Sequence, residues 1–192
     1  MNVVMIGFMA SGKTSVGRRV AKRLGFCFMD MDQFIEQEQG RTISEIFATE
    51  GEPYFRALET GLLRRLTHHD NTVISCGGGV VTTPGNLPLL KQIGAVVFLN
   101  ADPEDIIRRL EHDTRRPKVQ GGDLRQRVTT LLAQRLPLYE QADVAVQTLG
   151  KTPNQVAGEV IGKIAGHAKT APAPPAPASS KDGDPAASGS SA

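Results

Sequence analysis

Residues 7–14 read GFMASGKT, which fits the pattern GxxxxGK[ST]. An apolar run precedes these residues, and the helical pattern VGRRVAKRL follows them from Val16. In this order of strand, loop and helix the pattern marks a phosphate-binding loop, in which backbone N–H groups converge on phosphate oxygens at a helix N-terminus. A glycine-rich turn without a ligand is the alternative, and the flanking strand and helix argue against it.

The loop predicts contacts with a nucleoside triphosphate. Lys13 is expected to bridge the β- and γ-phosphates, and the Thr14 hydroxyl is expected to bind Mg²⁺. A GTPase or a mechanical ATPase would share this loop, so it indicates a nucleotide but not a reaction. The loop residues predicted to contact ATP are Gly7, Ala10, Ser11, Gly12, Lys13, Thr14 and Ser15.

Short apolar runs alternate with helical patterns along the chain. The runs are continuously hydrophobic, which is typical of strands buried on both faces. Strand alternating with helix favours right-handed crossovers and a parallel sheet covered on both faces. The sequence therefore predicts an α/β fold with a five-stranded parallel sheet and helices on both faces, the strands being Asn2–Ile6, Phe26–Met29, Thr72–Cys76, Ala95–Leu99 and Val144–Val146.

Four of the helices have recognisable starts. Thr42 and Glu45 in the sequence TISE form a predicted capping box. Elsewhere a capping side chain precedes a proline, which is favoured at the first position of a helix. These three predicted starts are Thr83-Pro84, Asp102-Pro103 and Thr152-Pro153.

Composition limits the classes of function. The 192 residues carry a formal net charge of +2, which is too small to indicate a nucleic-acid surface. The opening apolar run is much too short to cross a membrane, and the two cysteines do not suggest a disulfide scaffold. The sequence predicts a cytoplasmic monomer without nucleic-acid or membrane partners.

Composition changes abruptly near His167, where the chain becomes rich in Ala, Pro, Ser and Gly. Such a segment cannot bury enough apolar surface to offset the entropy lost on ordering. We therefore expect one domain over residues 1–166 and a disordered tail over residues 167–192.

Two carboxylates follow the second predicted strand. Asp30 and Asp32 lie where that strand turns into a helix, at the carboxyl edge of the sheet, where ligands bind in open α/β folds. Asp30 is predicted to hold the Mg²⁺ shell through a coordinated water molecule. Asp32 is predicted to accept a hydrogen bond from an acceptor hydroxyl, although a helix N-cap would also explain it.

Two further segments carry charge or unusual flexibility. Arg56 and Glu59 are three residues apart in a predicted helix, and by themselves they suggest a solvated surface pair. Residues 77–79 read GGG, which costs backbone entropy and brings no packing. Close approach of the main chain to a ligand or to the phosphate loop explains this run, and a flexible connector is the alternative.

The combined pattern resembles the shikimate kinase family. The phosphate loop, the Asp-x-Asp after the second strand, the FRALE segment from Phe55 and the GGG run occur in the family's order and approximate spacing. Arg115-Arg116-Pro117 resembles the family's mobile lid, and Arg135 to Tyr139 resembles its R-x-x-x-Y helix. The resemblance covers residues 1 to about 165 and implies a P-loop NTPase of the nucleoside monophosphate kinase-like type.

The resemblance implies specific roles for matching residues. It implies transfer of the γ-phosphoryl group of ATP, with Mg²⁺, to the 3-hydroxyl of shikimate, with Lys13, Asp32 and Arg116 as catalytic residues. Arg116 would lie in a lid over about residues 112–123 and reach the transferring phosphate. Arg109 and Pro153 match positions near the adenine. The implied shikimate contacts are Asp32, Arg56, Gly77, Gly78, Gly79 and Arg135, and the implied metal contacts are Thr14 and Asp30.

One residue departs from the family pattern, and two other functions would share part of the sequence pattern. Lys118 follows the lid proline where the family usually has leucine, so it adds a phosphate contact or lies in solvent. A gluconate kinase would share the loop and lid, but not the FRxxE, GGG and R-x-x-x-Y set. A catalytically silent nucleotide-binding module is the second rival, and it would bind ATP without phosphorylating any acceptor.

Overall fold

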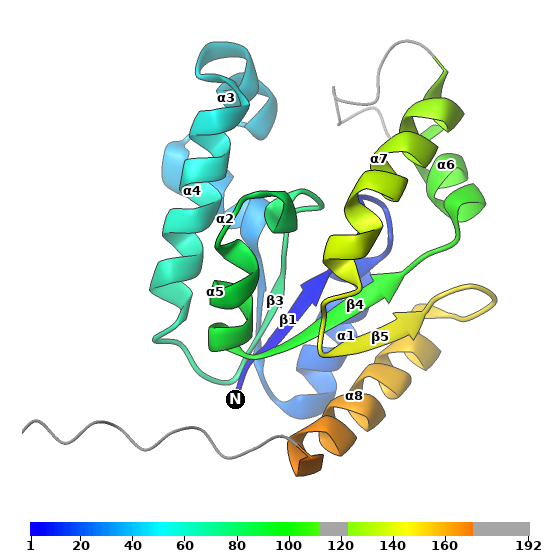
Figure 1. Cartoon of the computed structure of the whole chain (residues 1–192). Coiled ribbons are helices and arrows are strands. Elements are labelled where there is room, and N and C mark those ends of the chain that lie inside the picture. The colour runs from blue at the N-terminus through cyan, green and yellow to red at the C-terminus, as the bar shows by residue number, and fades with distance from the viewer. Residues whose placement is uncertain (112–122, 171–192) are drawn as a thin grey trace, which may run out of the picture.

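The computed structural model describes residues 1–111 and 123–170. Its five strands form one parallel sheet in the order β2-β3-β1-β4-β5 (Figure 1). Every predicted strand is present with its ends within one residue of prediction, which confirms the five-stranded parallel sheet. The strands are β1 Val3–Ile6, β2 Cys27–Asp30, β3 Thr72–Ser75, β4 Ala95–Asn100 and β5 Val144–Gln147.

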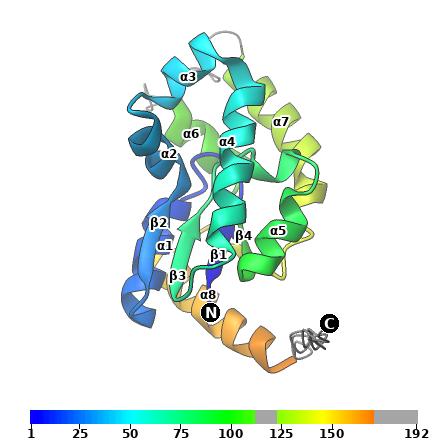
Figure 2. The same cartoon turned by 90° about the vertical axis from the view of Figure 1, so that its left-hand side faces the viewer.

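Helices cover both faces of the sheet, as predicted. Helices α1 and α8 pack on one face, and α4, α5 and α7 pack on the other, each layer with its own buried apolar cluster (Figures 1 and 2). The helices are α1 Lys13–Leu24, α2 Met31–Gln39, α3 Ile43–Thr49, α4 Gly51–Leu66, α5 Asn86–Ile93, α6 Pro103–Glu111, α7 Leu124–Tyr139 and α8 Pro153–Thr170, with a 3₁₀ turn η1 at Val80–Thr82.

The central strand β1 fixes where ligands can bind. Val3 pairs in register with Val73 of β3 on one side and with Ala95 of β4 on the other. All strands are parallel, so the loops after β1, β2 and β3 leave the sheet at the same carboxyl edge. Figure 2 shows α2 and α3 gathered at the end of α4 beside this edge. The phosphate loop after β1 and the glycine run after β3 are therefore neighbours.

The edge strands depart from the prediction of burial on both faces. The residues of β1 and β3 are all buried, but β2 is half-buried with Cys27 exposed. In β5, Val144 and Val146 are buried while Ala145 and Gln147 are exposed. An edge strand of a two-sided sheet receives less cover than a central one, and an apolar run four residues long does not reveal that position.

Three of the four predicted helix starts are confirmed. Thr42 and Glu45 form a reciprocal capping box at the start of α3. Asp102 accepts a hydrogen bond from the Glu104 N–H at 2.9 Å, and Thr152 accepts one from the Gln155 N–H at 3.3 Å.

The prediction that a helix starts at Thr83-Pro84 is wrong. Helix α5 begins at Asn86, after Gly85 in a left-handed conformation with φ 85°. The residues before Thr83 form the turn η1 instead, and the buried Asn86 side chain donates to the Val80 carbonyl oxygen at 2.9 Å. This hydrogen bond fastens η1 to the start of α5.

The predicted boundary of the tail is too early. Helix α8 continues to Thr170, so residues 167–170 are helical, and the rest of the predicted tail lies outside the described residues. Within residues 1–111 and 123–170, no helix is both long enough and apolar enough to cross a bilayer.

Candidate active site

A cleft of about 750 Å³ opens at the carboxyl edge of the sheet. It joins the phosphate loop, the end of β2, the glycine run after β3 and the helices α3, α4 and α7. Nearly all predicted site residues in the described part of the chain line this cleft. They are Ala10, Ser11, Gly12, Lys13, Thr14, Ser15, Asp30, Asp32, Arg56, Gly77, Gly78, Gly79, Arg109, Arg135 and Pro153.

Gly7 is the described exception among these residues, and its contact with ATP stays a prediction. It does not line the cleft, and a Cβ on Gly7 would lie 2.7 Å from the Leu99 carbonyl oxygen. Its φ of 143° is also one that residues with a side chain rarely adopt. Gly7 is therefore required where the loop leaves β1 beside β4.

The phosphate loop closes around the Lys13 side chain. The Lys13 ammonium donates to the carbonyl oxygens of Gly7 and Phe8 at 2.9 and 2.8 Å, and the residue is buried. Helix α1 starts at Lys13, after Gly12 in a left-handed conformation. A helix N-terminus beside a buried ammonium group favours bound anions, so the loop has the chemistry of a phosphate cradle.

Oxygen side chains meet beside the loop. The Thr14 hydroxyl donates to Asp30 Oδ2 at 2.7 Å, and Ser75 Oγ lies 3.5 Å from the same hydroxyl. In the part of the chain described, no group of three or more His, Cys, Asp or Glu side chains is arranged to hold a metal. This small set of hard oxygen donors fits Mg²⁺, which keeps several waters and is otherwise bound by substrate phosphates.

Asp30, rather than Asp32, caps helix α2. The Asp30 carboxylate accepts from the backbone N–H groups of Asp32 and Gln33 at 3.2 and 3.5 Å. The alternative explanation of Asp32 as the N-cap is therefore wrong. The Asp32 side chain lines the cleft, with Oδ1 2.9 Å from the position of a Cβ on Gly77.

The Arg56–Glu59 pair is formed by a buried carboxylate and a largely buried guanidinium, which corrects the expectation of a solvated pair. The Arg56 Nη1 atom donates to Glu59 Oε2 at 2.5 Å, and the Glu59 side chain is 0% exposed. Arg56 also donates to the half-exposed Glu52 at 2.8 and 3.2 Å. Two carboxylates thus fix the guanidinium at the wall of the cleft.

Burial is the main cause of the shift in the pKa of Glu59. Removal from water raises the pKa of Glu59 to about 7, although the positive charge of Arg56 opposes the shift. The nearby Asp32 carboxylate adds to the rise in this pKa. Among the described residues, no hydrogen-bond partner reaches Glu59 Oε1.

The glycine run packs closely against both halves of the cleft. A Cβ on Gly77 would lie 2.6 Å from Glu59 Oε1, and one on Gly78 would lie 2.9 Å from the Met9 nitrogen. A Cβ on Gly79 would collide with the Arg56 guanidinium. The predicted close approach to the phosphate loop is confirmed, and the alternative of a flexible connector is wrong.

Arg135 reaches the same turn from α7. Its Nη1 atom donates to the Gly78 carbonyl oxygen at 3.3 Å, and its guanidinium lies 5.6 Å from the centre of the Phe8 ring. Arg56 contacts the next glycine from α4, on the other side of the turn. Two guanidinium groups from distant segments therefore converge on one turn beside the phosphate loop.

Helices α6 and α8 add a positive charge and apolar side chains to the lining of the cleft. Arg109 of α6 donates to the Ala10 carbonyl oxygen at 2.8 Å and lies over the phosphate loop. Pro153 and Val156 at the start of α8 also line the cleft. The predicted lid residues Arg115, Arg116, Pro117 and Lys118 lie outside the described residues.

Several cleft residues escaped the sequence analysis. Ile43 and Phe47 of α3 and Phe55 of α4 line the cleft, and sequence alone could not distinguish them from core residues. Glu59 was visible only by its three-residue spacing from Arg56. Tyr139 was noted as part of a motif but was given no role.

Comparisons with known proteins agree with this geometry. The family model for shikimate kinase matches residues 9–165, which is most of the chain. The chain belongs to the shikimate kinase family. Members of this family are ATP-dependent phosphotransferases, so the chain is a kinase, as the sequence predicted.

Individual relatives cover most of both chains. The chain is 42% identical to the shikimate kinase of Geobacter metallireducens, over 86% of this chain and 92% of that one. It is 45% identical to the shikimate kinase of Thermodesulfovibrio yellowstonii, over 83% and 92%. A solved structure, shikimate kinase from Acinetobacter baumannii in complex with shikimate, is 37% identical with a TM-score of 0.83, covering 86% of this chain and 93% of that one.

A gluconokinase shares the fold alone. The structure from Sinorhizobium meliloti has a TM-score of 0.55 at 20% identity, covering 88% of this chain and 94% of that one. This likeness concerns the fold and indicates nothing about the acceptor.

The buried Glu59 predicts an unusual pH dependence of stability. Its pKa is about 7 in the folded protein and 4.5 in the reference state, so folding favours the protonated form. Its stabilising contribution is therefore full below about pH 4.5 and is lost as the pH rises to about 7. We expect the free energy of unfolding of the wild type to lose roughly 2–3 kcal/mol from this group between these pH values. Glu59→Gln is expected to remove that loss.

Denaturant unfolding at several pH values measures this difference. Glu52→Gln is the matched control, because Glu52 binds the same guanidinium but its side chain is 47% exposed. Parallel pH curves for wild type and Glu59→Gln would contradict the assigned pKa of Glu59.

Proposed function

We propose that this chain transfers the γ-phosphoryl group of ATP to the 3-hydroxyl of shikimate. The observation that carries the proposal is the convergence of Arg56 and Arg135 on a glycine turn that packs against the phosphate loop. The relative from Acinetobacter baumannii, solved in complex with shikimate, supports the same acceptor. Phosphorylated shikimate would serve the route to chorismate and aromatic amino acids, as the family resemblance implies.

In this proposal the two arginines bind the shikimate carboxylate. A guanidinium has five N–H donors, and Arg56 uses three of them on Glu52 and Glu59, which leaves two for a carboxylate. Planar guanidinium groups recognise carboxylates through paired hydrogen bonds. Backbone groups of Gly77, Gly78 and Gly79 can approach the acceptor ring because they carry no side chain.

Asp32 is the residue proposed to act on the acceptor hydroxyl. It follows the end of β2 at the carboxyl edge and lines the cleft near Gly77. A carboxylate accepts hydrogen bonds, so Asp32 would orient the attacking oxygen and can take its proton. Orientation matters most here because phosphoryl transfer has a loose transition state and depends mainly on positioning and charge.

The phosphate end supplies positive charge. Lys13 and the N-terminus of α1 would hold the β- and γ-phosphates, and Ala10, Ser11, Gly12, Thr14 and Ser15 complete the proposed loop contacts. Arg109 and Pro153, which both line the cleft, are proposed to hold the adenine. Arg116, outside the described residues, is proposed to reach the transferring phosphate when a lid closes and excludes water.

Thr14 and Asp30 are proposed to hold Mg²⁺. Their hydrogen-bonded oxygens lie beside the phosphate loop, and Ser75 contributes a third oxygen nearby. When bound, Mg²⁺ would neutralise charge on the β- and γ-phosphate oxygens.

ADP release tests the proposed acceptor. The protein is assayed with MgATP alone, with shikimate and with gluconate. We expect ADP release to depend on shikimate and to stay at the background rate with gluconate. Phosphorylation of gluconate instead would favour the gluconate kinase alternative, and ATP binding without any acceptor-dependent ADP release would favour a silent nucleotide-binding module.

The monomeric state, the cytoplasmic location and the absence of nucleic-acid partners stay predictions. The location is supported by two free cysteines, Cys27 and Cys76, in keeping with a reducing compartment. Gel filtration and light scattering of the purified protein measure the oligomeric state.

A further inference from the structure

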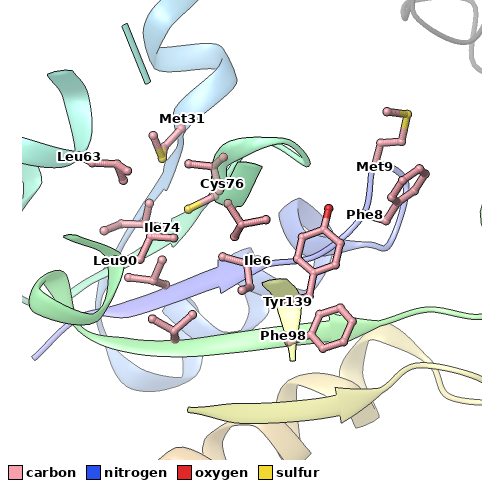
Figure 3. Packing of buried hydrophobic residues seen from close by; sticks show 14 of the residues in the cluster. Ile6, Phe8, Met9, Met31, Leu63, Ile74, Cys76, Leu90, Phe98 and Tyr139 are labelled. Atoms are coloured by element: carbon pink, nitrogen blue, oxygen red, sulfur yellow. The ribbon is translucent and has the colours of Figure 1, made fainter. Parts of the chain in front are cut away.

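Tyr139 is a buried polar side chain that the mechanism above does not use. It is the last residue of α7 and is 0% exposed. Its ring stacks on Phe98 of β4 with centroids 5.1 Å apart, and its hydroxyl is turned away from that ring (Figure 3). The hydroxyl donates to the Gly78 carbonyl oxygen. A core tyrosine thus binds the middle residue of the glycine turn.

The same carbonyl oxygen receives a second donor from the same helix. Arg135 precedes Tyr139 by four residues, so the two side chains share one face of α7. Arg135 Nη1 donates to the Gly78 oxygen at 3.3 Å, beside the hydrogen bond from the Tyr139 hydroxyl. The Gly78 carbonyl oxygen is therefore shared by a neutral hydroxyl and a charged guanidinium.

Gly78 joins the two halves of the cleft. On one side its Cα approaches the Met9 nitrogen of the phosphate loop so closely that a Cβ would lie at 2.9 Å. On the other side its neighbours Gly77 and Gly79 contact Asp32 and Arg56. Any movement of Gly78 therefore changes how the proposed acceptor groups lie relative to the phosphate loop.

Tyr139 stays a donor over the whole working pH range. Burial raises the pKa of Tyr139 to about 12, although the positive charges of Arg135 and Arg56 oppose the rise. The phenol is accordingly protonated at neutral pH and its O–H is available for the Gly78 carbonyl.

We propose that the Tyr139 hydroxyl is a positioning group for the acceptor site, because it satisfies the Gly78 carbonyl and so leaves the Arg135 guanidinium directed at the acceptor carboxylate. This inference rests on the proposed function. Without the hydroxyl, the Gly78 carbonyl would depend on Arg135 alone, and the guanidinium that already donates to it would be held closer to this oxygen. Arg135 would then bind the acceptor less well.

Tyr139→Phe tests the inference, because it removes one oxygen and keeps the ring on Phe98. We expect KM for shikimate to rise roughly 3- to 10-fold, the change that loss of one hydrogen bond produces. KM for ATP and kcat are expected to stay within about twofold of wild type, since the phosphate loop keeps its own hydrogen bonds. A role in stability alone would lower Tm without a selective change in KM for shikimate.

Tyr54→Phe is the matched control. Tyr54 is the other tyrosine of the chain, is 38% exposed and bonds Gln39 on the surface, so its removal is expected to change neither KM. An unchanged KM for shikimate in a folded Tyr139→Phe protein would overturn the inference while leaving the proposed function in place. Failure of the wild-type protein to phosphorylate shikimate would overturn both.

A double-mutant cycle shows whether Tyr139 acts through Arg135. The readout is kcat/KM at low shikimate, which stays measurable when KM is very high. We expect Tyr139→Phe to lower kcat/KM in the wild-type background but not further in an Arg135→Ala background. Equal factors in both backgrounds would show that the hydroxyl acts independently of Arg135 and would contradict the proposal.

Discussion

Lys13→Ala is expected to lower kcat by about 10²–10³-fold while the protein stays folded. Lys13 carries the buried positive charge of the phosphate loop and is held by the Gly7 and Phe8 carbonyl oxygens. The negative charge that spreads over the γ-phosphoryl oxygens in the transition state would lose its nearest cation from the protein. Steady-state ADP release at saturating ATP and shikimate measures the loss.

Lys22→Ala is the control for this prediction. Lys22 lies on the same helix α1 but is exposed, so its removal is expected to leave kcat unchanged. A far-UV circular dichroism spectrum and a Tm close to wild type would show that Lys13→Ala is folded. Turnover near the wild-type rate in folded Lys13→Ala protein would remove Lys13 from its proposed role.

Arg56→Ala is expected to raise KM for shikimate by at least about 10²-fold, with KM for ATP changed little. Two effects add in the same direction. The acceptor carboxylate loses a bidentate partner, and Glu59 keeps a buried carboxyl group without its counter-ion. Initial rates over a matrix of ATP and shikimate concentrations separate the two KM values.

Two further variants make this prediction decisive. Arg56→Lys keeps a positive charge beside Glu59 but loses the planar fork, so we expect it to fold and still to bind shikimate weakly. Arg64→Ala removes an exposed arginine from the same helix and is expected to behave as wild type. A rise in KM for ATP with an unchanged KM for shikimate would take Arg56 out of the acceptor site.

The sequence predicts the position of the phosphate loop because the residues of this loop are contiguous. Eight consecutive positions encode the turn, the lysine and the hydroxyl that form the phosphate loop, residues 7–14. The carboxyl edge of a parallel sheet then places Asp30 and Asp32 beside this loop without further information. The strand positions were also predictable, because short apolar runs alternate regularly with helical patterns along the chain.

The acceptor half depends on contacts between distant segments, which spacing alone cannot give. A spacing of three residues shows that Arg56 and Glu59 share a helix face, but not that the glycine turn covers that face. Similarly, nothing local to α7 shows that Tyr139 binds the carbonyl of a residue 61 positions earlier. The predicted start of α5 at Thr83-Pro84 failed because the chain first forms the turn η1 at Val80–Thr82 and begins α5 only after Gly85, where the Asn86 side chain binds the Val80 carbonyl oxygen.

A crystal structure of the protein with shikimate, Mg²⁺ and a non-hydrolysable ATP analogue measures the proposed geometry directly. We expect the shikimate carboxylate within hydrogen-bonding distance of both Arg56 and Arg135, and its 3-hydroxyl beside Asp32 and facing the γ-phosphoryl group. A carboxylate bound away from both guanidinium groups, with the ring turned so that no hydroxyl faces the nucleotide, would contradict the proposed acceptor site.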